Sequence, residues 1–355
     1  MLKVEEKLYQ INSLPVKTWN RLKINSTNIN IPQCDTFAEP VFKNAAFLNA
    51  AVSNEVLPAL KSGMGDDISR INAANPRAIH TVTIPENTVS DTPLIIEYRY
   101  GKGYFSNTLN IRLLPGSNIT CIVIYKALSH SDGISSHNIN VYAGHNSTLR
   151  LHTVQLLDGQ MCLHNIGAKL MDNASLLLNQ TEFGKCDLYT GACACLEGNN
   201  SSFSSDIHYV TDNSVTDMNY ISVHTGKNTE SNMNSMGVVR NNGKKTYRGT
   251  IDFVNGCTGS KGEEYENVLL LDENVVNRSI PLILCGEEDV EGNHGATIGN
   301  VDEATLFYMA SRGINVDNAK KLFASARLYS ALSSVPDEAI RKEIMDFCEE
   351  HKNVR

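Results

Sequence analysis

The residues best suited to chemistry in this chain include a histidine that follows a run of acidic side chains. His294 stands between Asn293 and Gly295, and acidic residues crowd the segment 287–291 just before it. A neutral imidazole in this setting can ligate a metal ion or carry a proton. The same pattern also fits a structural histidine, so the local sequence defines a candidate site without deciding its role.

Cysteines form a second group with chemical potential. Cys193 and Cys195 are expected on one face of a strand, because side chains two residues apart in a strand point the same way, and Cys186 lies close by in sequence. Thiolates are natural ligands for iron–sulfur chemistry, but the spacing contains no Cys-x-x-Cys pair, and buried free cysteines also pack as small hydrophobic residues. Both interpretations stay open, while the neighbouring His208 and His224 are interpreted as structural.

Other polar segments carry no recognisable catalytic pattern. The segments 226–229 and 259–261 combine glycine and lysine, but neither has the Gly-x-x-x-x-Gly-Lys-Ser/Thr spacing that cradles phosphate. Arg248 and Asp252 could form a charged pair, yet Asp252 has no second acid beside it for paired-carboxylate chemistry. We therefore interpret these segments as turns and a strand, and we expect no catalytic residue and no nucleotide hydrolysis in this chain.

Composition limits the classes of partner. The 355 residues are 20% charged and 41% hydrophobic, with a net charge of −8 and no excess of Lys and Arg, which argues against nucleic-acid binding. No stretch approaches the roughly 20 apolar residues that span a bilayer, and the first seven residues lack the apolar run of a signal peptide. We expect a cytoplasmic protein with reduced cysteines that binds neither nucleic acid nor membrane.

An internal repeat indicates the element that positions these groups. Four Asn-x-Ser/Thr segments, each leading into strand-forming residues, start 28, 27 and 27 residues apart, at Asn118, Asn146, Asn173 and Asn200. This period is too short for a βαβ unit but suits one coil of a β-solenoid. Asparagine tolerates left-handed backbone angles and so suits the turn that opens each coil. We expect stacked coils whose leucines, such as Leu149 and Leu176, alternate into one continuous core.

The repeat divides the chain into three segments. We expect an N-terminal mixed and partly helical segment over 1–75, with the Ala-rich stretch 44–51 as a candidate helix. The strand-rich core is expected over 76–297. A helical segment is expected over 298–355.

The C-terminal segment has clear helix signals. Asp302 is a suitable N-cap for a helix over 303–312, a second helix should begin after Asn315 or Asp317, and a third should begin at Pro336. For the second helix we predict an apolar face made of Val316, Ala319, Leu322, Phe323, Ala326 and Tyr329. For the third we predict an apolar face made of Ile340, Ile344 and Phe347.

Several short elements follow one another between residues 294 and 314: His-Gly-Ala-Thr, Asp-Glu, Leu-Phe-Tyr and Ser-Arg-Gly-Ile. In this order they resemble the SufB/SufD family of iron–sulfur cluster assembly proteins, and most closely its SufD branch. The segments 247–251 and 266–271 are similar to further family segments. SufB-type members carry His-Glu-Ala-Thr and a cysteine shortly before the proline that corresponds to Pro281. Here Gly295 follows the histidine, and 272–276 contains no thiol.

The resemblance implies a right-handed parallel β-helix with helical ends, in agreement with the repeat. It implies a non-catalytic scaffold that works with a SufC-like ABC-type ATPase, in which ATP is hydrolysed, and with a SufB-like subunit or a second copy of itself. His294 would be an iron or cluster ligand at the subunit interface. No tightly bound cofactor is expected, but a transient iron–sulfur cluster would form there. The expected partner-binding residues of the helical tail are Leu306, Phe307, Tyr308, Arg312, Leu322 and Phe323.

Two alternatives stay open. One is a homodimeric SufB/SufD-like scaffold that works with a SufC-like ATPase alone. The other is a carbohydrate-active β-helix enzyme, which would share the solenoid but would usually be secreted and would stack acidic or basic groups on successive coils. A single tryptophan argues against the enzyme.

Overall fold

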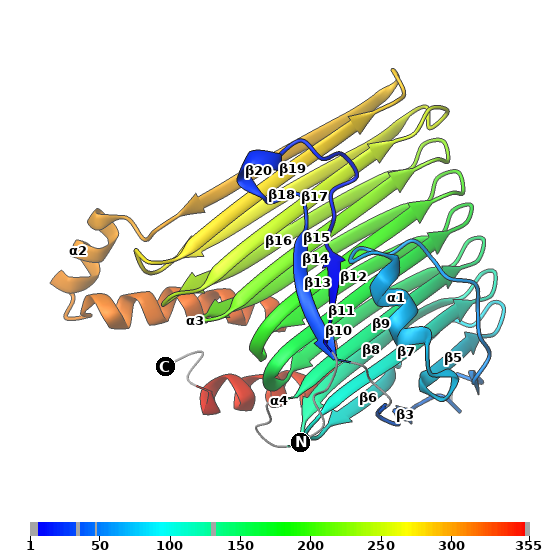
Figure 1. Cartoon of the computed structure of the whole chain (residues 1–355), viewed down its shortest axis with the longest axis horizontal. Coiled ribbons are helices and arrows are strands. Elements are labelled where there is room, and N and C mark those ends of the chain that lie inside the picture. The colour runs from blue at the N-terminus through cyan, green and yellow to red at the C-terminus, as the bar shows by residue number, and fades with distance from the viewer. Residues whose placement is uncertain (1–5, 33–35, 47, 129–132, 352–355) are drawn as a thin grey trace.

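The computed structural model describes residues 6–32, 36–46, 48–128 and 133–351. Residues 1–5, which the expectation about a signal peptide used, lie outside these ranges, as does Phe47 of the Ala-rich stretch. Most of the described chain is a β-solenoid, as the repeat predicts: successive strands alternate between two sheets that run the length of the molecule (Figure 1).

Each sheet has nine strands and is parallel apart from its N-terminal edge strand, β3 or β4. The first sheet, called here the β20 sheet, has the order β20 (Val290–Gly299), β18 (Ser260–Leu270), β16 (Glu230–Arg240), β14 (Ser202–Asp212), β12 (Ser175–Glu182), β10 (Thr148–Leu156), β8 (Asn118–Ala127), β6 (Leu94–Tyr100), β3 (Val41–Lys43). The second, the β19 sheet, has the order β19 (Val276–Cys285), β17 (Lys244–Phe253), β15 (Val215–His224), β13 (Lys185–Leu196), β11 (Asp158–Leu170), β9 (Ile134–Ala143), β7 (Tyr104–Leu113), β5 (Ile79–Ile84), β4 (Ala51–Ser53).

Asparagine turns open the coils, with one correction to the predicted repeat. Asn146, Asn173 and Asn200 have φ values of 57°, 55° and 57°, the left-handed conformation that the repeat predicts. Asn118 does not: it is the first residue of β8 and pairs with Thr148, while Gly116 takes the left-handed position of that coil. The Asn-x-Thr motif is therefore two residues out of register in the first copy.

The core lies between the two sheets. Paired positions on neighbouring strands stack, as Ile119, Leu149 and Leu176 do in β8, β10 and β12. All three are buried in one hydrophobic cluster that runs along the solenoid. Because each strand alternates its side chains between faces, this stacking confirms the predicted continuous core.

The N-terminal segment covers the outer face of the β19 sheet. The antiparallel strands β1 (Glu6–Ile11) and β2 (Thr27–Pro32) lie across its strands, next to helix α1 (Asp66–Ala73) (Figure 1). Two 3-10 turns, Asn20–Leu22 and Pro76–Ala78, complete the segment. The prediction of a helix over 44–51 is wrong: its described residues before Ala51 form the connection between β3 and β4, and Ala51 begins β4, because both ends of the stretch join the solenoid sheets.

Three helices form the C-terminal tail: α2 (Glu303–Ser311), α3 (Val316–Ser334) and α4 (Glu338–Glu350). The side chains of Asp302, Asn315 and Asp337 accept hydrogen bonds from backbone N–H groups of the first turns, which confirms the first two expected helix starts and places the third just after Pro336. Helix α4 and the C-terminal half of α3 pack on the outer face of the β20 sheet, where Ile340 and Ile344 are buried as predicted.

Candidate iron site and partner-binding surface

The C-terminal end of the solenoid is open. At the N-terminal end, β3 and β4 pair antiparallel with β6 and β5. At the other end, β20 and β19 are the edge strands of their sheets in the described chain. An edge strand presents unpaired backbone N–H and C=O groups, which are a template for pairing with another chain.

His294 lies on β20 at this open end and is exposed. Its partner in the parallel ladder is Glu264 of β18, and their side chains point to the same face of the sheet. That face is the interior one, since Val290, four residues earlier on β20, packs against the core. The imidazole therefore stands at the mouth of the solenoid interior.

The interior directly below His294 is charged. Lys245, Glu264 and Glu266 are 0%, 3% and 2% exposed. Lys245 forms an ion pair with Glu266, which also accepts a hydrogen bond from Ser279. Burial raises the pKa of Glu264 to about 7, although the nearby Lys245 opposes this shift. Burial also lowers the pKa of Lys245 well below its ordinary value.

Sequence inspection missed these three residues. The spacing of two residues between Glu264 and Glu266 could have indicated the pair, because it places both carboxyl groups on one face of a strand. Their closeness to His294 depends on the pairing of β18 with β20, which no local pattern shows.

The described residues contain no group of three or more His, Cys, Asp or Glu side chains arranged to hold a metal ion.

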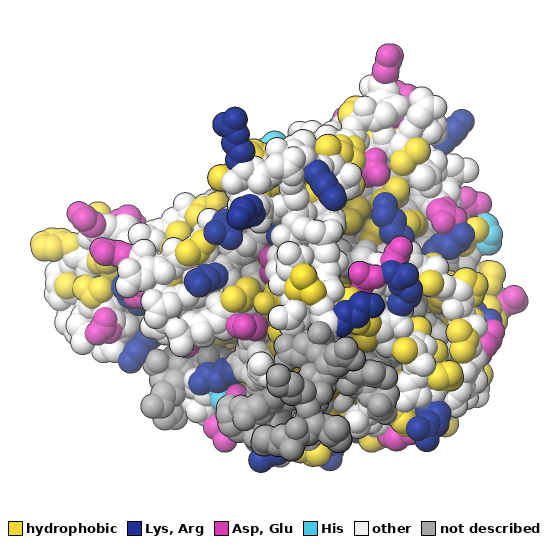
Figure 2. All heavy atoms as spheres, viewed as in Figure 1, with side chains coloured by type: hydrophobic (Ala, Val, Ile, Leu, Met, Phe, Trp, Pro, Cys, Tyr) yellow, Lys and Arg dark blue, Asp and Glu magenta, His cyan; other side chains and the backbone are white. Residues whose placement is uncertain are grey.

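Helix α2 carries three of the predicted partner-binding residues, and a fourth, Arg312, is its C-cap residue. It buries none of its residues, and Phe307 and Tyr308 are 77% and 56% exposed. Arg312 lies 5.4 Å from the Tyr308 ring centroid, a cation–π contact, and Leu306 is half-buried. Figure 2 shows hydrophobic side chains gathered at the projecting tip that α2 forms. An exposed aromatic group of this kind is typical of an interaction surface.

Helix α3 carries the other two predicted residues, Leu322 and Phe323. Leu322 is 53% exposed and Phe323 is half-buried. The apolar face predicted for this helix is wrong except at Ala319: the buried residues are Ala319, Ala324, Ser325, Leu328, Ala331 and Leu332. Val316, Leu322 and Tyr329 are thus exposed, while Leu328 and Leu332 pack against the sheet.

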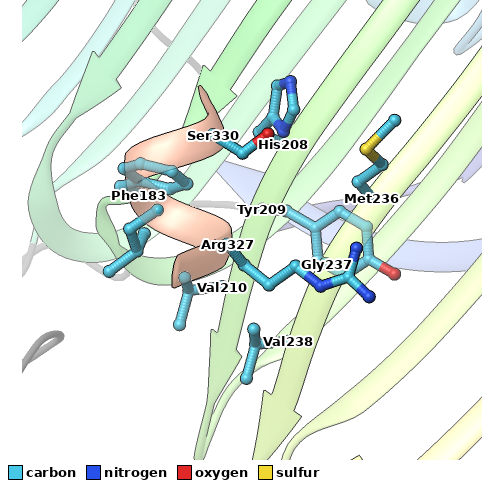
Figure 3. Close-up of a pocket in the computed structure, with 10 residues that line it drawn as sticks. Phe183, His208, Tyr209, Val210, Met236, Gly237, Val238, Arg327 and Ser330 are labelled. Atoms are coloured by element: carbon cyan, nitrogen blue, oxygen red, sulfur yellow. The ribbon is translucent and has the colours of Figure 1, made fainter. Parts of the chain in front are cut away.

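The contact between α3 and the β20 sheet is close. Arg327 donates a hydrogen bond from Nη2 to Oδ1 of Asn267, 2.9 Å away. Figure 3 shows Arg327 reaching from α3 toward β16, the strand that carries both Met236 and Val238, beside a small pocket. This contact fixes the orientation of the helix that leads back from α2.

The three cysteines do not form one cluster. Cys186 points into the interior, where Gln155 Nε2 lies 3.0 Å from its Sγ. Cys193 and Cys195 occupy the outer face of the same strand and contact each other. The hydrogen bond with Cys193 lowers the pKa of Cys195, whereas the same bond and burial raise that of Cys193. The predicted common face of Cys193 and Cys195 is confirmed, while Cys186, close by in sequence, lies on the opposite face of the strand.

His208 and His224 have structural surroundings. His224 is buried and hydrogen-bonds Thr229 and Ser231 through its two ring nitrogens, at 2.7 and 2.9 Å. His208 lines the small pocket beside α3 and is 8% exposed. Burial lowers the pKa of both imidazoles, that of His224 to about 4, so both are neutral at physiological pH.

Comparison with known proteins gives a consistent picture. A family model described as SUF system FeS cluster assembly, SufBD core domain, matches residues 98–327. The iron–sulfur cluster assembly protein SufD of Bacillus subtilis is 28% identical over 127 residues, which are 36% of this chain and 29% of that protein. A SufBD family protein of Staphylococcus epidermidis is 22% identical over 298 residues, 82% of this chain and 63% of its own length.

A chloroplastic SufBD family protein of Arabidopsis thaliana is 24% identical over 269 residues, 72% of this chain and 48% of that protein. The chain therefore spans less than two thirds of the length of each of these three relatives. No helix in the described part of the chain combines the length and the apolar character needed to cross a membrane.

Proposed function

The chain belongs to the SufBD family of the SUF iron–sulfur cluster assembly system, and from this membership we propose that it is a scaffold subunit rather than an enzyme. Its open solenoid end joins a SufB-like subunit, and its helical tail receives a SufC-like ATPase. A transient iron–sulfur cluster is assembled at the joint, with His294 as the ligand from this chain. The chain itself holds no permanent cofactor.

The observation that carries this proposal is the pair of edge strands β19 and β20 beside an exposed imidazole. Two solenoids that meet through such edges would continue each other's sheets and cover both open interiors. His294 would then lie at the interface, where ligands from the second chain can complete a site. The exposed aromatic residues of α2 supply a separate apolar surface for the ATPase.

Co-expression followed by size exclusion and native mass spectrometry tests the interface. The chain is expected to co-elute with a SufB-like protein and a SufC-like ATPase from the same source. Ile298→Glu places a charge on the exposed end of β20, where Ile298 is 42% exposed, and should dissociate the SufB-like subunit. Val89→Glu is the matched control, because Val89 is 71% exposed near the opposite end of the solenoid.

The results separate the alternatives. A complex that contains two copies of this chain and the ATPase, but no SufB-like protein, would favour the homodimeric scaffold, since the same edges can pair with a second copy. Absence of every complex, or equal effects of the two substitutions, would contradict the proposal. A carbohydrate-active β-helix enzyme is disfavoured by the family, and turnover of a polysaccharide by the purified chain would restore it.

A further inference from the structure

The buried charges below His294 are unevenly partnered. Lys245 is committed to Glu266, and its Nζ also lies 3.3 Å from the carbonyl oxygen of Arg278 and from the hydroxyl of Ser279. Glu264 lacks a comparable set of polar partners: its Oε2 atom is buried and has no hydrogen-bond partner in the described structure. A buried carboxylate oxygen without a partner is costly, so its retention needs an explanation.

The structure also reserves space for this carboxyl group. A Cβ atom on Gly249, on the facing β17, would lie only 2.3 Å from the Glu264 carboxyl carbon and from Oε1. A glycine at position 249 therefore allows the carboxyl group to occupy the interior. The packing of the solenoid interior therefore accommodates a buried carboxyl group at position 264.

Glu264 and His294 are placed to act on one ion. They are direct neighbours in the parallel ladder, and strands in a sheet lie about 4.8 Å apart. Both side chains face the interior, one buried and one at the mouth. Metal ligands bind at roughly 2.0–2.2 Å, so an imidazole nitrogen and a carboxylate oxygen from adjacent coils can reach a single cation between them.

We propose that Glu264 is a second ligand of the His294 site and holds an incoming ferrous ion from inside the solenoid. This inference rests on the proposed function, because it concerns the cargo of the same site. Imidazole nitrogen and carboxylate oxygen together suit a borderline divalent ion such as Fe²⁺. The cation supplies the partner that Glu264 Oε2 lacks, and the outward positions of the ion stay open to ligands from the second subunit.

Titration of the tag-free full chain with Co²⁺, an air-stable probe for Fe²⁺, tests the proposal by calorimetry. The chain is expected to bind one Co²⁺ in a manner that His294→Ala abolishes. Glu264→Gln, which keeps the shape of the side chain, should weaken binding by at least about tenfold. Glu263→Gln is the matched control, since it makes the same charge change on the exposed outer face of the same strand and should leave binding unchanged.

Gly249→Ala provides an independent variant that retains both ligands. Its added Cβ occupies the space of the Glu264 carboxyl group, so it too should weaken Co²⁺ binding, with circular dichroism used to confirm that the chain is folded. The proposal is overturned if Glu264→Gln binds Co²⁺ as tightly as the unaltered chain, or if the unaltered chain shows no His294-dependent binding. Complex formation with partner chains is a separate readout that Glu264→Gln should not alter, so failure of this inference can be told from failure of the proposed function.

Discussion

At the scale of single residues, Arg248 ties the N-terminal segment to the solenoid. Its Nη1 lies 2.7 Å from Oδ1 of Asp217, and its Nε donates to the carbonyl oxygen of Ile24 at 2.9 Å. Asp217 also accepts hydrogen bonds from Asn12 and Thr27, both at 2.7 Å. Arg248 is 1% exposed, so the pair depends on this complete set of partners.

We predict that Arg248→Met destabilises the protein by about 3–5 kcal/mol, because it leaves Asp217 as an uncompensated buried charge. Urea unfolding followed by circular dichroism measures the loss. Arg150→Met is the control: Arg150 is exposed and hydrogen-bonds only Asn118 among the described contacts, so its effect should be within about 0.5 kcal/mol. Equal unfolding midpoints for the two variants would contradict the role of the buried pair.

This pair also shows what the sequence conceals at the residue scale. Sequence inspection considered Arg248 with Asp252, four residues away, whereas its partner Asp217 belongs to the preceding coil of the same sheet. Asp252 lies on the outer face of β17, where partial burial raises its pKa. Contacts between coils depend on strand register, so neither this pair nor the pairing of Glu264 with His294 follows from local spacing.

At the scale of elements, the asparagine turns link each coil to the next. The Nδ2 of Asn173 donates to Oδ1 of Asn146 at 3.0 Å, and the Nδ2 of Asn200 donates to Oδ1 of Asn173 at 3.2 Å. Each asparagine therefore does two things: it adopts a left-handed conformation, and it extends a ladder of side-chain amides. Substitutions at the middle position can separate the two contributions.

We predict that Asn173→Ala costs more stability than Asn173→Gly. Alanine loses the amide ladder and must also adopt the left-handed backbone, at a cost of about 1–2 kcal/mol. Glycine loses only the hydrogen bonds, each of which contributes roughly 1 kcal/mol. Chemical denaturation of the three proteins gives the order. If the alanine and glycine variants unfold at the same denaturant concentration, the backbone conformation does not limit stability at this turn.

The repeat predicts the solenoid well. One coil cannot bury its own apolar face, so each coil needs apolar residues at equivalent positions, and their period is visible in the sequence. The tail helices are predicted in position, and the buried face is predicted for α4 but not for α3. Leu322 and Tyr329 were assigned to the apolar face of α3, yet the helix buries Leu328 and Leu332 together with alanines such as Ala324. Apolar residues occur on several faces of this helix, so hydrophobicity alone does not reveal which face packs on the sheet.

At the scale of the whole molecule, the solenoid is covered on both outer faces and open at one end. The N-terminal ribbon and α1 cover the β19 sheet, while α3 and α4 cover the β20 sheet. Only α2 stands clear of the described body, next to the open edge of β20 (Figure 1). This arrangement places the proposed ATPase surface and the proposed subunit joint at the same end, where only residues 300–302 separate α2 from β20.

Two substitutions on opposite faces of α3 should separate attachment of the tail from partner binding. Leu328 is 2% exposed in the cluster that joins α3 to Val154 and Phe183, so Leu328→Asp should lower the free energy of unfolding by several kcal/mol. Hydrogen exchange should then increase along α3 and α4. Leu322 is 53% exposed, so Leu322→Asp should leave stability within about 0.5 kcal/mol but weaken capture of a SufC-like ATPase.

This division of α3 into a packing face and a partner face requires that Leu328→Asp lowers stability and that Leu322→Asp lowers ATPase capture without lowering stability. Because both variants replace leucine by aspartate in one helix, a general effect of added charge would alter stability and capture alike in both. Loss of ATPase capture without loss of stability in Leu322→Asp would assign the exposed face of α3, like Phe307 and Tyr308 of α2, to the partner. Unchanged capture of the ATPase by that variant would restrict the partner surface to α2, and α3 would then serve only to pack against the β20 sheet.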